Sequence, residues 1–329
     1  MEAAHKLLVF SLLTAATLSA QNPSFTGVVN AASGIPPGFP NSGLAQGSVF
    51  TAYGSNLGAV PAAPAAVNLA TLPLPTTAGL AGTTINITVD GTTLPVPILF
   101  TNTGQVAGVI PSNTPVGTGT LTVTFNGKSG STPVTIVQSA FGISNIFLQY
   151  TDNGVGNGQA AIATFGTNQT QVVTNTDTAK PGDTLILWGT GLGGTTTDTS
   201  GAPFGNVGTQ PLVFVGGVQS PSVTYWGRSP GSVGLDQIVF TVPQNAPLGC
   251  NVGIVVETMN GTTPIVSNGP TLSLAATDGA ACSDPNELFP TSIFNPADQS
   301  GAKGFLVSVA QKAVVSVNSN GTTSTSIST

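Results

Sequence analysis

Residues that could perform catalysis are scarce in this chain. The sequence holds one histidine, His5, near its N-terminus. An imidazole is the usual base that activates a serine or cysteine nucleophile, and it is a common zinc or copper ligand. His5 falls within a segment that has the pattern of a cleaved secretory signal, so the exported chain would contain no imidazole. We therefore predict a protein that is not an enzyme of these types and that uses no cofactor.

Paired carboxylates are the remaining route to hydrolysis, since cleavage of a glycosidic bond needs only two. Most carboxylates of this chain lie beside Gly, Thr or Pro, which are turn-forming residue types. We expect them to be solvated turn residues, and a hydrolase is only a third hypothesis. The residues concerned are Asp90, Asp152, Asp183, Asp198 and Asp236.

Two short acidic segments resemble fragments of a metal site. Asp152-Asn153-Gly154 matches part of a calcium loop, and Asp284 with Glu287 could contact calcium or cap a short helical turn. Neither segment supplies the remaining ligands that calcium requires. We predict no metal site, and a hairpin turn at Asp152.

Aromatic side chains are the candidates for non-catalytic binding, because they stack on sugars or anchor protein partners. The four candidates are Tyr53, Trp188, Tyr225 and Trp226. Packing in a hydrophobic core is the alternative role for each of them.

The N-terminus and the cysteines both indicate export. Lys6, the apolar run from Leu7 to Leu13 and the small residues before Gln21 form the pattern of a signal peptide over residues 1–20. This run is too short to span a bilayer, and an apolar N-terminal strand is the alternative. We expect a secreted or cell-surface protein with no transmembrane segment in the mature chain. Cys250 and Cys282 then predict one disulfide, with two buried free thiols as the alternative.

The charge composition argues against nucleic acid as a partner. Charged residues make up 5% of the chain, the net charge is −6, and no Lys/Arg cluster is present to neutralise phosphates. Hydrophobic residues make up 40%, which is enough to bury cores. We expect a partner at the cell exterior, either a protein or a polysaccharide.

One stretch of the sequence occurs twice, which predicts a duplicated domain. Gln46 to Gly58 reads Q-G-S-V-F-T-A-Y-G-S-N-L-G, and Lys180 to Gly193 reads K-P-G-D-T-L-I-L-W-G-T-G-L-G. Asn126-Gly127 similarly corresponds to Asn260-Gly261. The spacing is far longer than a solenoid repeat.

Short runs of β-forming residues separated by turn residues surround both copies. Thr83 to Val89 alternates apolar and polar residues, and Asp90-Gly91 and Asn126-Gly127 are hairpin signals. This pattern predicts two antiparallel β-sandwiches. Further strands are expected at 25–32, 97–100, 106–110, 119–125, 132–137, 147–150, 160–165, 171–174, 185–188, 212–215, 223–225, 238–242, 252–258, 271–274, 304–309 and 313–317.

The two copies resemble the opening strand of IPT/TIG immunoglobulin-like domains, whose pattern is roughly G-x-x-V-x-I-x-G-x-n-L. The segment Pro73 to Gly117 is similar to tandem Ig-like modules of largely uncharacterised exported bacterial proteins. The resemblance covers about Phe25 to Ala275 and implies no catalytic residues. The second copy departs from the pattern at Pro203-Phe204-Gly205, which stands in place of P-L-P, and in a longer segment from Gly227 to Gly234.

The predicted organisation is a signal peptide (1–20), a first Ig-like sandwich (21–140), a second (141–277) and a C-terminal extension or truncated further module (278–329). The resemblance also implies that Phe50, Leu185 and Leu187 face the sandwich cores. Tyr53 and Trp188 then lie on the outer faces, partly covered, because side chains alternate across a strand.

Two functions follow from this organisation. The first is a non-catalytic exported or cell-surface protein for adhesion, scaffolding or matrix interaction; the alternative is a carbohydrate-binding accessory module of a polysaccharide-degrading system. Exposed, coplanar aromatics on one sheet face favour the second function. A broad Thr/Ser/Asn face without them favours the first.

Overall fold

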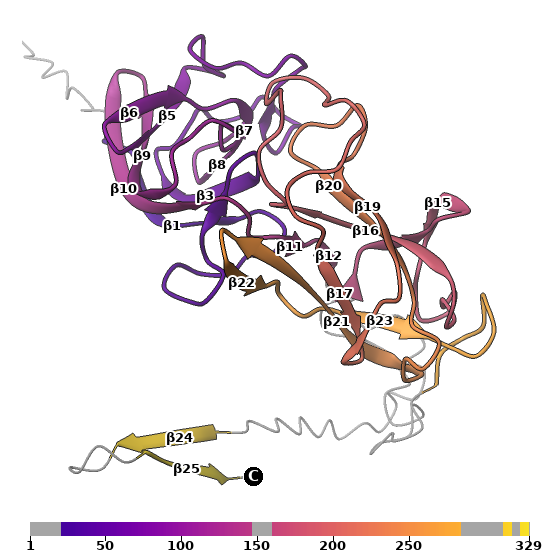
Figure 1. Ribbon diagram of the computed structural model, residues 1–329. Helices are drawn as coiled ribbons and strands as arrows, with labels where there is room; N and C mark the ends of the chain where they lie inside the picture. The colour runs from indigo at the N-terminus through magenta and orange to yellow at the C-terminus, as the bar shows by residue number, and fades with distance from the viewer. Residues whose placement is uncertain (1–20, 147–159, 284–311, 318–322, 329) are drawn as a thin grey trace, which may run out of the picture. The chain divides into compact units, whose positions relative to one another are not determined.

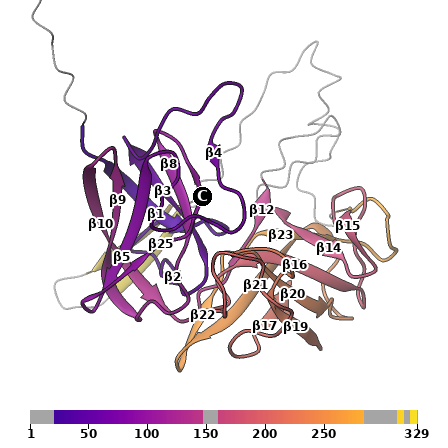
Figure 2. The same ribbon diagram turned by 90° about the horizontal axis from the view of Figure 1, so that it is seen from above.

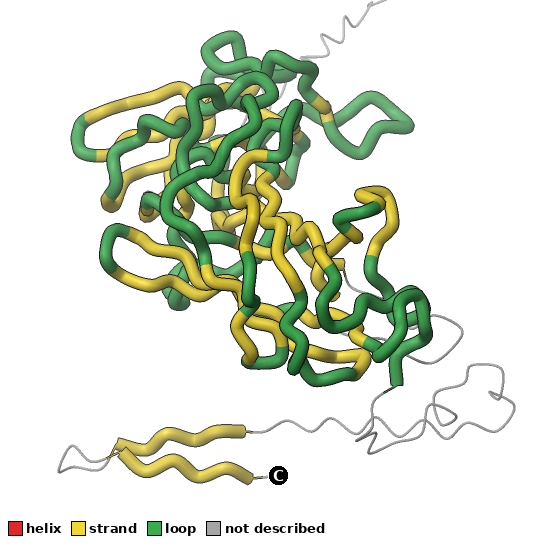
Figure 3. Tube along the Cα trace, turned by 45° about the vertical axis from the view of Figure 1, so that its right-hand side comes forward, coloured by secondary structure: helices red, strands yellow, loops and turns green. Residues whose placement is uncertain are grey.

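The chain is all-β where its structure is described. The computed structural model describes residues 21–146, 160–283, 312–317 and 323–328, and these form strands and connecting loops (Figures 1 and 3). Within these ranges, no helix has the length and apolar character needed to cross a membrane. Two compact units are distinguished: residues 1–149 with 156–287, and residues 150–155 with 288–329.

The first sandwich consists of two five-stranded sheets (Figure 2). One has the order β1 (Ser24–Asn30), β3 (Val49–Ser55), β8 (Gln105–Val109), β7 (Ile98–Thr101) and β4 (Asn68–Leu69). The other has the order β2 (Leu44–Ala45), β10 (Lys128–Val137), β9 (Gly117–Phe125), β5 (Thr83–Val89) and β6 (Thr92–Pro95).

Sequence alternation and turn chemistry explain this sandwich. In β5 every second residue is buried, as the alternation predicts. Asp90-Gly91 joins β5 to β6 and Asn126-Gly127 joins β9 to β10, with positive φ at all four residues. Positive φ at both central residues defines the type I′ turn, which matches the twist of paired strands. Both predicted hairpins are confirmed.

The second sandwich repeats this plan with additional short strands. One sheet has β15 (Asn168–Val172), β14 (Ala163–Phe165), β16 (Thr184–Thr190), β20 (Asp236–Thr241) and β19 (Val223–Arg228), with β11 (Gly142–Ile143) also pairing with β16. The other has β12 (Asn145–Ile146), β13 (Ala160–Ala161), β23 (Thr271–Leu274), β21 (Gly249–Asn260), β17 (Leu212–Val215) and β18 (Val218–Gln219), with β22 (Thr263–Val266) also pairing with β21.

The duplication is visible in the strand pairing. β3 pairs with β8 as β16 pairs with β20. A short parallel contact recurs before each repeated strand: Ala45 pairs with Val137, and Ala179 with Leu274. Apart from this contact and the parallel pair β13–β23, the described strand pairs are antiparallel. The fold is therefore two tandem immunoglobulin-like β-sandwiches followed by a C-terminal extension.

Each sandwich has its own hydrophobic core, and the predicted register is confirmed. Phe50 belongs to the first core, and Leu185 and Leu187 to the second, all fully buried. Tyr53 lies on the opposite face and is 41% exposed. Trp188 is half-buried there, and its indole N–H donates to Thr164 Oγ1 at 3.0 Å.

The predicted disulfide is also confirmed. Cys250 and Cys282 are bonded, with their Cα atoms 5.1 Å apart. The beginning of the extension is held on the second sandwich by further bonds: the Cys282 N–H donates to Asn175 O, and Thr178 Oγ1 donates to Ala280 O. Lys180 forms an ion pair with Asp278 as well.

Several predictions lie outside the described residues. These are the signal peptide, the strands at 147–150 and 304–309, the turn at Asp152 and the cap at Asp284 and Glu287. The expected strand 313–317 corresponds to β24 (Lys312–Val317), which pairs with β25 (Thr323–Ser328), a strand that the sequence did not predict.

Candidate ligand-binding groove

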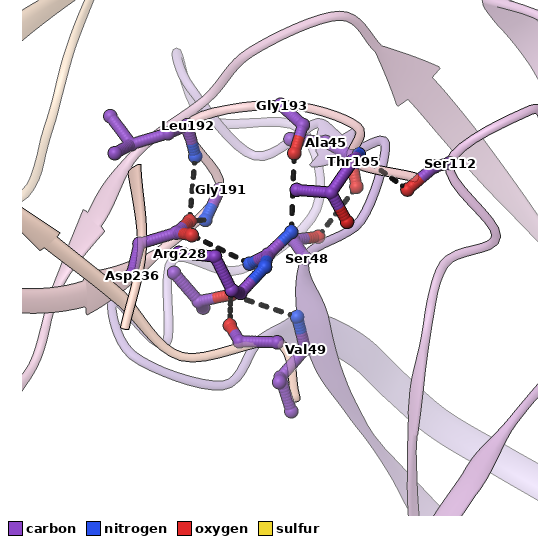
Figure 4. A network of polar contacts seen from close by, with 12 residues as sticks. Ala45, Ser48, Val49, Ser112, Gly191, Leu192, Gly193, Thr195, Arg228 and Asp236 are labelled. Atoms are coloured by element: carbon purple, nitrogen blue, oxygen red, sulfur yellow. Dashed lines mark hydrogen bonds and ion pairs between the residues drawn. The ribbon is translucent and has the colours of Figure 1, made fainter. Parts of the chain in front are cut away.

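A buried ion pair organises the region where the second sandwich meets the first (Figure 4). Arg228 Nη1 on β19 donates to Asp236 Oδ1 on β20 at 2.6 Å, and the two side chains are 2% and 0% exposed. The other carboxylate oxygen of Asp236 accepts N–H bonds from Gly191 and Leu192, at 2.7 and 2.9 Å. The pair thereby holds the glycine-rich segment that follows β16.

The environment of Asp236 overturns the expectation of a solvated turn. Burial raises the pKa of Asp236, and this is opposed by the Arg228 guanidinium and by the N–H groups of Leu192 and Gly191. Desolvation penalises an isolated charge, so a carboxylate in this position needs its bonded partners.

Arg228 also lies close to Gly47 of the first sandwich. It is the only arginine in the sequence, and its Nη2 donates to Gly193 O at 3.3 Å. A Cβ atom built on Gly47 would lie 2.6 Å from that Nη2. Gly47 therefore leaves the space that the guanidinium occupies, and its φ of +71° suits glycine.

Hydrogen bonds from two parts of the first sandwich, Val49 and Asn30, reinforce this junction. The Val49 N–H donates to Thr190 Oγ1 at 2.9 Å, and that hydroxyl donates to Gly234 O at 2.6 Å. Asn30 Nδ2 donates to Thr190 O and Ala140 O, at 3.1 and 3.3 Å.

The loop after β16 is tied to the first sandwich through Ser112. Both oxygens of Asp198 accept from Ser112, from its N–H at 2.8 Å and its hydroxyl at 2.5 Å. The same hydroxyl accepts from the Thr195 N–H at 2.8 Å, and the Leu74 N–H donates to Thr199 O at 2.7 Å. Asp198 is thus a half-buried bridging residue, and the expectation of a solvated turn was wrong here too.

Two adjoining cavities follow this loop and together form what we call the groove. The first, of about 650 Å³, lies between Pro95, Pro97, Pro111 and Ser112 of the first sandwich and Thr195 to Thr199 of the second. The other, of about 460 Å³, extends from Thr195 and Thr196 to Phe204 and Asn206. Thr195 and Thr196 line both cavities.

An exposed aromatic ring stands at the second cavity. Phe204 is 72% exposed and stacks on Tyr225, with ring centroids 4.4 Å apart and planes inclined by 25°. Tyr225 is buried, and its hydroxyl donates to Arg228 O at 2.6 Å. Burial raises the pKa of Tyr225, and the donated hydrogen bond requires its neutral form.

The four aromatic residues that the sequence indicated do not form a shared platform. Tyr53 lies on β3 of the first sandwich, whereas Trp188 lies on β16 of the second. Tyr225 is buried beneath Phe204, and Trp226 packs against the second core, with its indole N–H directed to Gly208 O at 3.4 Å. Tyr225 lies beside the groove as the support for Phe204, and Trp226 is bonded to Asn206 and Gly208, which line the second cavity.

Sequence reasoning missed Phe204 and Arg228, although two signals pointed to them. Both lie where the second copy departs from the first: Phe204 replaces the leucine of P-L-P, and Arg228 and Gly234 lie in the longer segment. The departures from the repeat therefore mark the candidate site.

The outer face of one sheet is covered with hydroxyl groups. Across β6, β5, β9 and β10, exposed side chains pair as Thr88 with Thr93, Thr122 with Ser131 and Thr124 with Ser129, at 2.7–2.8 Å. In the part of the chain that the structure describes, no group of three or more His, Cys, Asp or Glu could hold a metal ion.

Comparisons with known proteins do not identify a family. No family model matches the sequence, and no curated protein matches it. Among solved structures, a tandem of titin Ig domains shares 11% identity, covering 71% of this chain and 90% of that chain, with a TM-score of 0.18. Another titin tandem shares 8% identity, covering 70% and 61%, also at 0.18.

A glycoside hydrolase is also among the similar structures. It is an endo-fucoidan hydrolase of family 107, with 13% identity, covering 60% of this chain and 24% of that chain, and a TM-score of 0.17. TM-scores this low carry no argument. The Ig-like fold rests on the sheets and their pairing.

Proposed function

We propose that this chain is a non-catalytic exported protein, secreted or at the cell surface, that acts in adhesion, scaffolding or matrix interaction. Its two sandwiches would be of the IPT/TIG type and would belong with the tandem modules of exported bacterial proteins. The observation that carries the proposal is the set of hydrogen bonds that join the two sandwiches, from Val49 to Thr190 and from Ser112 to Asp198. Domains in one chain usually move relative to each other unless their interface is extensive. A bonded junction instead makes the pair one rigid spacer with fixed binding surfaces.

Three further observations support an extracellular role. A disulfide persists in oxidising compartments, and Cys250 and Cys282 form one. The N-terminal residues have the pattern of a secretory signal. The hydroxyl-covered sheet face supplies a broad polar contact surface with few charges.

Export and adhesion can be tested together on the full chain. Expressed in a bacterium with general secretion, it should appear outside the cytoplasm, and its intact mass should show cleavage before Gln21 and one disulfide. Beads coated with the purified product should adhere to extracellular matrix material more than beads coated with an unrelated Ig-like tandem. Retention in the cytoplasm with both thiols reduced would contradict export, and equal adhesion of the two bead types would contradict the adhesive role.

The second candidate is a carbohydrate-binding accessory module of a polysaccharide-degrading system. One observation favours it specifically, namely the exposed Phe204 ring that is held over Tyr225 beside the groove. An exposed aromatic ring in a fixed orientation is a common means of binding a sugar through its apolar face.

A further inference from the structure

We propose that the groove from Ser112 to Phe204 binds a stretch of an uncharged polysaccharide, with the Phe204 ring as its stacking platform. This inference rests on the second candidate function and assigns its site and its class of ligand.

The Phe204 ring is positioned before any ligand arrives. One of its faces lies on Tyr225, whose hydroxyl is bonded to the backbone carbonyl of Arg228. Arg228 is itself fixed by the buried ion pair with Asp236. Because this support is fixed, little ordering entropy remains to be lost when a planar apolar surface covers the free side of the ring.

Hydroxyl and amide groups line part of the groove. Thr195, Thr196 and Thr197 lie along one side, and Asn113 and Asn206 lie one in each cavity. Hydroxyls and amides both donate and accept hydrogen bonds, as the hydroxyls of a sugar do. The rings of Pro95, Pro97 and Pro111 add flat apolar surface in the larger cavity.

The charges of the groove favour a neutral ligand. Asp198 is the carboxylate that lines it, and both of its oxygens already accept hydrogen bonds from Ser112. Arg228 is the cation that lines it, and this side chain is 2% exposed and bonded to Asp236 and Gly193. A polyanion would therefore find no accessible cation among the groove residues. The net charge of the chain, −6, would also repel it.

The dimensions of the groove favour a polymer segment over a single sugar. One cavity of about 650 Å³ and another of about 460 Å³ share Thr195 and Thr196 as lining residues. Each is as large as a site for a drug-sized molecule, so together they accommodate several consecutive sugar units.

The test measures binding of the full chain to soluble polysaccharides by affinity electrophoresis and titration calorimetry. The probes are a neutral β-glucan, a neutral galactomannan and an arabinoxylan, with polygalacturonate as the anionic comparison. Phe204→Ala should weaken binding to the preferred neutral polymer about tenfold, while Phe204→Trp should retain it. Phe39→Ala is the matched control, because Phe39 is 63% exposed on a loop of the first sandwich, away from the groove residues. It should leave binding unchanged.

Each contrary outcome is distinct. Tighter binding of polygalacturonate than of all neutral probes overturns the ligand class. Equal affinities of Phe204→Ala and Phe39→Ala, with unchanged unfolding temperatures, overturn the groove as the site. If none of the polysaccharides binds but the coated beads still adhere to matrix material, this inference and the second candidate function fail while the proposed adhesive function stands.

Discussion

Arg228 is a single side chain that positions the candidate binding groove on this duplicated fold. Its guanidinium is withdrawn from water, beside a carboxylate with three bonded partners. A buried ion pair adds little stability over well-packed apolar residues, but removal of one partner leaves the other uncompensated. The value of this pair is therefore positional, because it fixes the loop that forms the groove and the tyrosine that supports Phe204.

Replacement of Arg228 by methionine should destabilise the chain by about 3–5 kcal/mol at neutral pH, because Asp236 is left charged and buried. Without the guanidinium, the pKa of Asp236 should rise further above its ordinary value. A carboxyl group whose pKa is raised by folding contributes its full stabilisation of the folded state at pH values below its unfolded pKa, about 3.9. This contribution is lost as the pH rises through the pKa of the folded state. The deficit should therefore be smaller at pH 4 than at pH 7.

Urea unfolding of Arg228→Met and of the unsubstituted chain at both pH values measures this effect. Lys128→Met is the control, since it removes an exposed cation at the first residue of β10. The control should change the free energy of unfolding by no more than about 0.5 kcal/mol. A deficit that is equal at both pH values would contradict the assigned role of the Asp236 charge.

Gly47 offers a separate test of how closely the sandwiches approach. Gly47→Ala should cost about 1–3 kcal/mol more than Gly91→Ala, because both glycines have φ near +70° but only a Cβ at Gly47 meets fixed atoms. Those atoms are Arg228 Nη2 and Gly193 O. Gly182, the repeat equivalent, faces the flexible Gln244 amide, so Gly182→Ala should resemble Gly91→Ala. Thermal unfolding of the three variants measures the difference, and equal losses would contradict a close contact at Gly47.

The residue scale is also where prediction from sequence was weakest. Asp198 lies between two threonines and Asp236 lies two residues after Gly234, which suggested solvated turns. Nothing local distinguishes a carboxylate whose partners come from other segments. The available signal that Asp236 could belong to an ion pair was the presence of a single arginine in a chain with few charges. The cysteine pairing was predictable because the sequence has only two cysteines, so each has one possible partner, and because export was expected.

At the scale of elements, strand alternation determined most of what could be foreseen. β3 and β16 place Phe50 and Leu187 inward and Tyr53 and Trp188 outward, as predicted. Short strands such as β2 and β4 were missed, because two residues carry no periodic pattern and their pairing depends on tertiary contact. The hairpins were predictable because Asp-Gly and Asn-Gly adopt positive φ at low cost.

Two substitutions in β3 should separate its faces energetically. Phe50→Ala removes a fully buried ring from the first core and should cost about 3–5 kcal/mol. Tyr53→Ala, three residues further on and largely outside the core, should cost less than about 1 kcal/mol. Chemical denaturation of both variants provides the comparison. A larger loss for Tyr53→Ala would mean that the strand register is displaced by one residue.

At the scale of the whole molecule, the junction couples two cores that are otherwise separate. Thr190 illustrates the coupling, because its hydroxyl accepts from Val49 of the first sandwich and donates to Gly234 of the second. Ala45, Val137 and Ala140 form a small apolar cluster nearby, against which Ile265 of the second sandwich packs. Unfolding of either sandwich would leave buried polar groups of the other without their hydrogen-bond partners.

The two sandwiches should therefore unfold in one calorimetric transition of the full chain. Thr190→Val keeps the side-chain volume but leaves the Val49 N–H and the Gly234 carbonyl without this partner, at a cost of about 1–3 kcal/mol for each unsatisfied group. We expect this variant to broaden the transition or divide it into two, because the Thr190 hydroxyl bonds that it removes help to join the two sandwiches. Thr122→Val removes an exposed hydroxyl pair with Ser131 and should preserve the single transition. Two well-separated transitions in the unsubstituted chain would show that the sandwiches unfold independently, and the rigid spacer that the proposed function requires would then be untenable.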